Sequence, residues 1–327
     1  MYSEPNVETG QIGADPREAE VARLVENLNS LTEGEQTVGK LIAFGRLAIE
    51  PLRRFLMNGK PSVVYQPRRW AVEALAGLGA KDILIEYLKR KKTILDAAVR
   101  FGEEPVENAA ARALCRWPTE DVFQTLLEIS RRRSQLGLVD ALGRFQRVEA
   151  IPYFLHALED DICRSAAEEA LRTLGAAAGP ALIEAALTRL PSPEEERPSS
   201  ARRRMSALQI LSEMDLAKET WPALRPLIAD VHTEIVIAIS KIAVKLGDHQ
   251  DRTAAAQRLL EVLPSADWFA QGGIETALAE LYEDASGILE AELARRNSFP
   301  DEQRVIDRAL RTLLHVKRQV DVAKGTS

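Results

Sequence analysis

Clusters of lysine and arginine are the residues of this 327-residue sequence whose chemistry stands out. Residues 51–150 hold 18 Lys/Arg against 12 Asp/Glu, although the whole chain has a net charge of −6. Closely spaced cations create a positive potential that attracts anionic partners. Two such clusters follow apolar segments and are candidate partner-binding residues: Lys89, Arg90, Lys91, Lys92, Arg131, Arg132 and Arg133. The alternative is a solvated edge whose charges complement helix C-termini.

A third group combines cations with an aromatic ring. Trp70 follows Arg68 and Arg69, and it is the only tryptophan of the chain that follows two consecutive cations. An aromatic ring beside cations is a candidate ligand contact, so we add these three residues to the candidate partner-binding set. The other three tryptophans are expected to pack in the core: Trp117, Trp221 and Trp268.

The sequence shows no catalytic, cofactor-binding or metal-binding constellation. None of its four histidines belongs to a His-x-x-x-His or His-Glu pair, and Cys115 and Cys163 lack the spacing of metal ligands. Metal sites need several such side chains that converge on one point. The segment Gly77–Gly79 has no third glycine and follows a helical pattern, so it does not fit a dinucleotide-binding loop. We therefore expect neither enzymatic activity nor a cofactor.

A repeated apolar stripe predicts the elements that position these residues. In residues 71–78, small or apolar side chains stand at positions i, i+3, i+4 and i+7, which is the spacing of one helix face. Eight copies of the stripe and a weaker first copy repeat at intervals of 28 to 40 residues. The last positions of the nine copies are Phe44, Leu78, Trp117, Phe145, Leu174, Met214, Leu246, Leu281 and Leu313. Repetition of this period indicates an array of helical units.

A second apolar helix follows each stripe after a short turn. Proline stands near the start of several of these second helices, at Pro51, Pro152, Pro180 and Pro222. Proline is favourable there because the first-turn N–H has no helical partner. A helix pair cannot bury both of its faces alone, and stacking of neighbouring pairs completes the core. The predicted fold class is therefore all-α, an α-solenoid of about nine helix pairs, in which the basic clusters that end consecutive second helices form one positive edge.

The repeat resembles a known family. Residues 139–145, 149–152 and 155–158 (VDALGRF, EAIP and LHAL) are similar to the HEAT-like repeat of the phycobilisome-lyase type, and residues 166–187 resemble it too. The resemblance covers roughly residues 34–315 and implies an armadillo-like helical fold. It says little about function, because such repeats serve scaffolds, lyases, hydroxylases and DNA-repair proteins alike. The di-iron hydroxylases among them use repeated His-Glu pairs, which this sequence does not contain.

The sequence is compatible with three functions, which we rank as follows. The first is a non-enzymatic scaffold or adaptor whose concave face, formed by second helices, binds a protein partner, since extended concave surfaces are what solenoids offer. The second is a nucleic-acid-binding solenoid that uses the basic edge. The third is a chromophore lyase or maturation factor, which rests on the name of the repeat alone.

Composition completes the sequence-based expectations. Residues 1–15 are expected to be a disordered lead, residues 16–315 the solenoid, and residues 316–327 a flexible tail. Residues 189–201 contain three prolines and three consecutive glutamates and predict a loop, which is either a hinge or a surface insertion. No apolar run approaches the roughly 20 residues of a membrane helix, and the two cysteines do not suggest disulfides. We therefore expect a cytoplasmic protein with no membrane partner.

Overall fold

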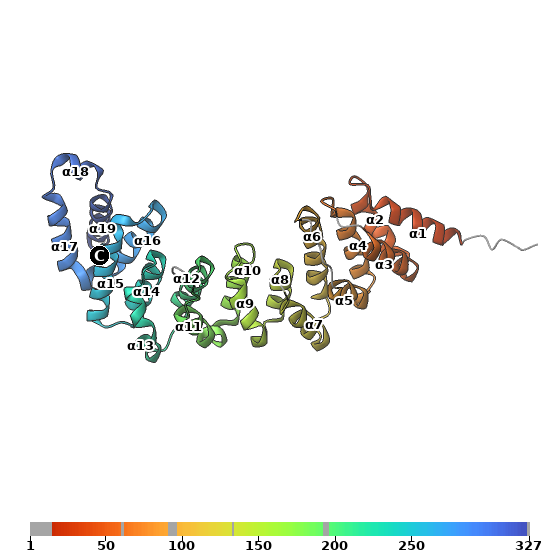
Figure 1. Ribbon diagram of the computed structural model, residues 1–327, viewed down its shortest axis with the longest axis horizontal. Helices are drawn as coiled ribbons and strands as arrows, with labels where there is room; N and C mark the ends of the chain where they lie inside the picture. The colour runs from red at the N-terminus through yellow and green to blue at the C-terminus, as the bar shows by residue number, and fades with distance from the viewer. Residues whose placement is uncertain (1–14, 60–61, 91–96, 133, 192–195, 326–327) are drawn as a thin grey trace, which may run out of the picture. The chain divides into compact units, whose positions relative to one another are not determined.

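Helices form nearly all of the regular structure. The computed structural model describes residues 15–59, 62–90, 97–132, 134–191 and 196–325 (Figure 1). Of these residues 81% are helical, and their sole strand-like pairing is an isolated bridge between Pro191 and Glu196. Ordinary domains are about one-third helical. The predicted all-α, solenoid-like fold class is confirmed.

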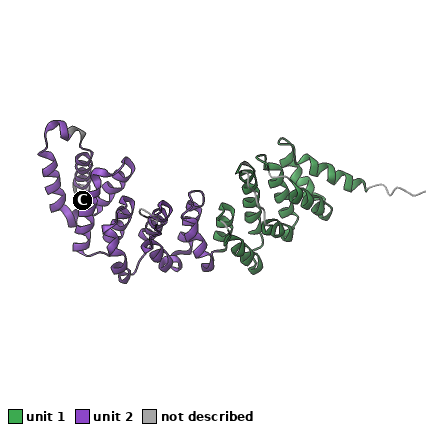
Figure 2. Ribbon diagram, viewed as in Figure 1, with its two compact units in different colours: residues 1–145 green, residues 146–327 purple. Residues whose placement is uncertain are grey.

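The chain divides into two units, residues 1–145 and 146–327 (Figure 2). The helices of unit 1 are α1 (Pro16–Asn27), α2 (Gly34–Ala43), η1 (Gly45–Ala48), α3 (Ile49–Asn58), α4 (Gln66–Gly77), α5 (Lys81–Lys89), α6 (Ala97–Leu114), α7 (Glu120–Ser130) and α8 (Leu136–Phe145). The stripe helices α2, α4, α6 and α8 pack in succession, and the second helices α3, α5 and α7 do the same. Unit 1 is therefore a two-layer stack of helix pairs.

Unit 2 is built on the same plan. Its first half contains η2 (Val148–Ala150), α9 (Ile151–Ala157), α10 (Arg164–Leu174), η3 (Gly175–Ala178), α11 (Gly179–Leu187), α12 (Pro198–Glu213), η4 (Lys218–Thr220), α13 (Trp221–Leu224) and η5 (Arg225–Ala229). Its second half contains α14 (Thr233–Leu246), α15 (His249–Val262), η6 (Leu263–Ser265), α16 (Trp268–Glu280), α17 (Tyr282–Asn297), α18 (Asp301–Ile306) and α19 (Arg308–Gly325). The first helices α12, α14, α16 and α19 pack in succession, so they form one layer of the unit.

The stripe residues form the core of each unit. Ala71 and Leu75 of α4, and Leu142 of α8, are all fully buried. Fully burying a leucine side chain removes apolar surface from water and stabilises the fold by about 1.5–3 kcal/mol. The stripe thus predicted core residues in both units, although its last position is only half-buried in most copies, as at Leu78 and Leu174.

Two expectations about the tail and the long loop differ from the structure. Residues 316–325 of the expected tail at 316–327 belong instead to α19, which runs to Gly325 and buries Val316. Residues 326 and 327 lie outside the described residues. The expected loop at 189–201 is shorter, because α12 begins at Pro198. The division between the units falls after residue 145, and the 189–201 segment lies inside unit 2. The expected lead at 1–15 lies outside the described residues except for Asp15, which caps α1.

Candidate functional site

Two residues of the basic edge predicted from the sequence, Lys89 and Arg132, lie on either side of one acid in unit 1. Lys89, the last residue of α5, and Arg132, just after α7, both form ion pairs with Glu128, at N–O distances of 4.0 and 2.8 Å. All three side chains are about half exposed. Arg131 is exposed and has no ion pair with a described residue. Lys91, Lys92 and Arg133 of the predicted edge lie outside the described residues.

Two other bases, within or just after second helices of unit 1, also have partners. The guanidinium of Arg90 donates to the backbone carbonyl of Met57, at 2.6 Å. Arg53 forms a two-pronged ion pair with Glu86, with distances of 2.8 and 3.1 Å. Exposed pairs of this kind contribute little to stability. They do lower the positive potential of the edge, because carboxylates stand among the cations.

Arg68 lies inside unit 1, which corrects its assignment as a candidate partner-binding residue. Its guanidinium forms a two-pronged ion pair with Glu103 of α6, at 2.5 and 2.8 Å, and donates to the hydroxyl of Tyr87 at 2.7 Å. All three residues are buried, and burial raises the pKa of Tyr87 well above its usual range. A buried charge requires such a partner. Arg68 therefore joins α4, α5 and α6 and is not available to a partner protein.

Trp70 and Arg69 have separate surroundings. The ring of Trp70 is half-buried and lies so close to Gly34 of α2 that a Cβ added to this glycine would stand 2.2 Å from it. This contact gives Trp70 a packing role between α2 and α4. Arg69 is exposed and has no ion pair with a described residue. The structure therefore does not bring the three residues of this candidate group to one surface.

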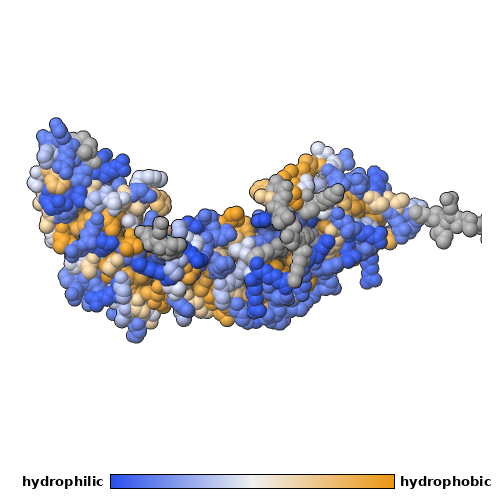
Figure 3. Space-filling model, viewed as in Figure 1, coloured by the Kyte–Doolittle hydropathy of each residue, from blue (hydrophilic) through white to orange (hydrophobic). Residues whose placement is uncertain are grey.

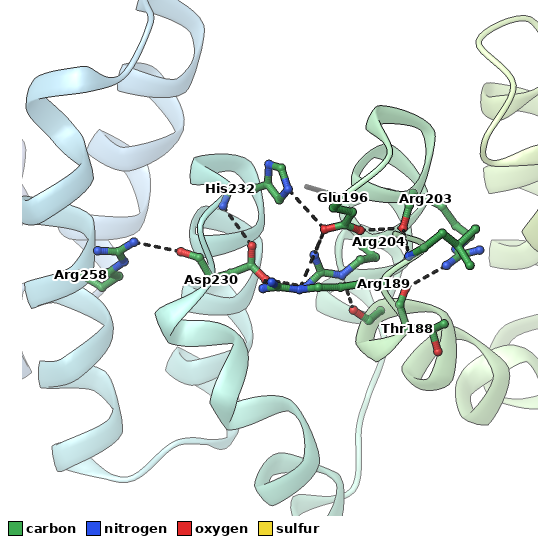
Figure 4. Close-up of polar contacts among 11 residues, drawn as sticks. Thr188, Arg189, Glu196, Arg203, Arg204, Asp230, His232 and Arg258 are labelled. Carbon is green, nitrogen blue, oxygen red and sulfur yellow. Dashed lines mark hydrogen bonds and ion pairs between the residues drawn. The ribbon is translucent and has the colours of Figure 1, made fainter. Parts of the chain in front are cut away.

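An ion-pair cluster around Asp230 absorbs another set of cations in unit 2 (Figure 4). The buried carboxylate of Asp230 accepts hydrogen bonds from Arg204 at 2.5 Å, from Arg189 at 2.6 Å and from the backbone N–H of His232 at 3.0 Å. Burial by itself raises the pKa of this carboxyl, but the N–H and the two guanidiniums together outweigh burial and hold the pKa below its usual value. Asp230 is therefore a stable anion at neutral pH.

Arg204, from α12, is the buried cation of this cluster. Its side chain is 0% exposed and donates to Glu196 at 2.7 Å and to the carbonyl of Ala186 at 2.9 Å, in addition to Asp230. Each nitrogen of this buried guanidinium donates to a partner within the fold, so we assign the cluster a structural role. The cluster connects Arg189 and Glu196 of the 189–201 segment to Arg204 of α12 and to Asp230 at the end of η5 (Figure 4).

A groove between first helices of unit 2 is the candidate functional site, and the sequence analysis did not predict it. The groove has a volume of about 610 Å³ and lies between α12, α14 and α16. Its lining residues are Met205, Gln209 and Ser212 of α12, Glu234, Ile237, Ala238 and Lys241 of α14, and Trp268, Phe269, Ala270, Gly272, Gly273 and Thr276 of α16. Ligand pockets usually measure about 300–1,000 Å³ and are mostly apolar with a few polar groups. The groove fits that description.

Two exposed aromatic side chains form the rim of the groove. Trp268 is 80% exposed and Phe269 is 74% exposed. Both belong to the first turn of α16, whose start is fixed by Asp267, since its carboxylate accepts the N–H of Ala270 at 2.8 Å. The expectation that Trp268 packs in the core was wrong. By contrast, Trp221 is buried, as expected, and its indole N–H donates to Asp251.

Small residues keep the groove open. Gly272 and Gly273 stand next to each other inside α16, where two glycines destabilise a helix by about 2 kcal/mol relative to alanines. A Cβ added to Gly273 would lie 3.1 Å from Cδ1 of Ile237, whereas a Cβ added to Gly272 would meet no atom within 4 Å. The first glycine therefore borders open space, and the second lets α16 approach α14 closely.

Figure 3 shows apolar residues between hydrophilic ones along the visible face of both units. Scattered apolar residues are normal on protein surfaces. What distinguishes Trp268 and Phe269 is that they are adjacent, large and at the edge of a hollow.

The residues that could support other chemistry have ordinary surroundings. No group of three or more His, Cys, Asp or Glu side chains that could hold a metal ion occurs among the described residues. His249 contacts Asp284 at 2.9 Å, and burial raises the pKa of the Cys115 thiol, which makes it a poorer nucleophile. In the part of the chain that the structure covers, no helix is long and apolar enough to span a membrane.

Comparison with known proteins gives distant structural neighbours alone. No protein-family model matches the chain, and no curated protein matches it. A structure of human deoxyhypusine hydroxylase in complex with glycerol is similar with a TM-score of 0.31 and 18% identity, over 84% of this chain and 99% of that chain. A crystal structure of an engineered protein has a TM-score of 0.31 and 14% identity, over 93% of this chain and 79% of that chain. The fold assignment therefore rests on the helices described above.

Proposed function

We propose that the chain is a non-enzymatic scaffold that binds a short apolar segment of a partner protein in the groove between α12, α14 and α16. The observation that carries this proposal is the exposed pair Trp268 and Phe269 at the rim of the groove. Exposed aromatic side chains are enriched at protein interfaces, where a few of them supply most of the binding energy. Beside the hollow lined by Met205 and Ile237, they offer an anchor for apolar side chains of a partner.

The charge of the groove favours a protein segment over a nucleic acid. Its lining contains one acid, Glu234, and one base, Lys241, so the formal charges cancel. Nucleic-acid binding depends on several cations that neutralise phosphates. The basic edge of unit 1 is a weaker candidate than the groove, because Glu128 pairs with both Lys89 and Arg132 there.

The proposal places the partner on a different layer from the one the sequence suggested. We expected the second helices to bind it, but all thirteen lining residues of the groove belong to first helices. Figure 1 shows α12 and α14 in one layer of unit 2, with α11 and α13 in the other. The turn of α16 that carries Trp268 is therefore accessible without any rearrangement of the second helices.

A selection with displayed peptides tests the proposal. Random dodecapeptides displayed on phage are selected on the full chain and counter-selected on Gly272→Trp, a variant that places a large side chain where the groove is open. We expect enriched peptides that share two or more large apolar residues and lose binding on Gly272→Trp. Ile162→Trp, at an exposed site of unit 2 outside the groove, is the matched control and should bind them normally. Failure to enrich any peptide that distinguishes these two variants would contradict the proposal.

A further inference from the structure

We propose that the bound segment carries one basic and one acidic residue, placed on either side of its apolar anchors. This inference rests on the proposed function and specifies the ligand of the same groove. Its basis is the pair Glu234 and Lys241, whose opposite charges line the groove from one helix, α14.

The two charges are separated along the groove. Glu234 and Lys241 are seven residues apart on α14, which corresponds to about 10 Å along the helix axis. Ile237 and Ala238 lie between them and also line the groove. The order along the helix is therefore acid, apolar patch and base. A ligand with the complementary order places its own base near Glu234 and its acid near Lys241.

Both charges lack a partner among the described residues, which sets them apart from the charges around them. Neither Glu234 nor Lys241 forms an ion pair or a side-chain hydrogen bond with a described residue. The next lysine on α14, Lys245, donates to the backbone carbonyl of Ser212, and Arg172 of α10 pairs with Glu213 of α12 at 2.7 Å. Among the described residues, these neighbouring charges thus have partners within the fold, whereas the two that line the groove have none.

The position of each charge suits an intermolecular contact. Lys241 is half-buried and lines the groove beside apolar residues. A lysine in such a place packs its apolar stem against its neighbours and keeps its charge accessible to water or a ligand. Glu234 is exposed in the first turn of α14. Charges at a partly desolvated rim fix the register and orientation of a ligand more than they raise its affinity. We therefore assign Glu234 and Lys241 the role of setting direction, and Trp268 and Phe269 the role of anchoring.

A charge-swap selection tests this assignment. The same peptide library is selected on the unaltered chain and on the double variant Glu234→Lys/Lys241→Glu, which exchanges the two charges without altering the net charge. We expect both selections to yield the same apolar core, with the order of basic and acidic residues inverted. The spacing of the selected charges reports the bound conformation, about three residues for an extended segment and about seven for a helical one.

Affinity measurements on single peptides quantify the effect. A peptide selected on the unaltered chain should bind Lys241→Glu about 3- to 10-fold more weakly, as expected when one partly exposed attraction becomes a repulsion. Exchange of its acidic residue for lysine should restore binding to within about twofold. Lys40→Glu, an exposed site in unit 1, is the control and should leave the affinity unchanged.

The outcomes separate this inference from the proposed function. The selected peptides can share an apolar core but carry random charges, or carry a charge order that the double variant does not invert. Either result overturns the role of Glu234 and Lys241 and leaves the groove as the binding site. If no selected peptide loses binding on Gly272→Trp, the proposed function itself is overturned.

Discussion

The rings of Trp268 and Phe269 stand edge to face, with their centroids 5.9 Å apart and an interplanar angle of 83°. This is a preferred geometry of aromatic pairs. Each ring thus limits the freedom of the other before a ligand arrives, and less conformational entropy is lost on binding. Their exposure has no structural explanation within the described part of unit 2, whereas a role as a preorganised anchor accounts for it.

Replacement of both anchors should separate binding from folding. Trp268→Ala/Phe269→Ala removes two exposed rings, and substitutions at such positions usually alter the free energy of unfolding by less than about 0.5 kcal/mol each. Loss of binding hot spots costs about 2 kcal/mol or more, which corresponds to at least about 30-fold in Kd. Calorimetric titration with a selected peptide and urea unfolding measure the two quantities. An unchanged Kd would remove these residues from the site.

Leu142→Ala should destabilise unit 1 by about 2–5 kcal/mol. The side chain of Leu142 is fully buried, and truncation of a buried leucine removes transfer free energy and leaves a cavity. Leu31→Ala is the matched control, because Leu31 is an exposed leucine of the same unit and its truncation should cost less than about 0.5 kcal/mol. Urea unfolding followed by circular dichroism measures both variants. Equal midpoints for the two would contradict the burial of the stripe.

Arg204 and Arg202 should differ sharply, although they are neighbours in the Arg202–Arg204 run. Arg204→Met removes the fully buried cation that pairs with Asp230 and Glu196 and leaves them the half-exposed Arg189. Disruption of a buried ion pair costs about 3–5 kcal/mol. Arg202→Met removes only a partly exposed pair with Asp161, which contributes about 0–1 kcal/mol. Thermal unfolding of both variants provides the comparison. Similar destabilisation by the two changes would refute the assigned structural role of the cluster.

Asp230 should make unit 2 sensitive to acid. Its pKa is lowered in the folded state, so its contribution to stability is complete above the unfolded pKa of about 3.9 and is lost as the pH falls through the lower folded value. Below about pH 4, the free energy of unfolding should therefore change less steeply with pH in Asp230→Asn than in the unaltered chain. Asp301→Asn, a change at an exposed acid of unit 2, should keep the original slope. Urea midpoints measured between pH 2.5 and 6 give both slopes.

The sequence predicted the core of the fold because helical periodicity is a local property. Leu142 and Leu75 share one stripe position and are both fully buried. The same geometry could have predicted the anchors, since at 100° per residue Trp268 and Phe269 lie about 120° and 140° away from Ile274, the first stripe residue of their helix. The adjacent glycines of α16 were a second signal, because a helix tolerates them at a cost that a groove can explain.

Long-range partners were not predictable in this way. Arg68 precedes Ala71 by three residues and therefore lies on the stripe face of α4. A cation can occupy that face only with a buried counter-charge, and Glu103 is 35 residues away in the sequence. One sequence gives no means of pairing such distant residues. For the same reason, the sequence could not show that Glu128 pairs with both Lys89 and Arg132.

The central claim, that the groove of unit 2 binds a partner segment, is tested most directly by fluorine NMR. Incorporation of 5-fluorotryptophan gives one signal for each of the four tryptophans, and Trp268→Phe identifies the signal of Trp268. Titration with a selected peptide should shift the Trp268 signal in a saturable manner and leave the buried Trp221 signal in place. A peptide that binds without moving the Trp268 signal, or that shifts Trp70 in unit 1 instead, would contradict the account.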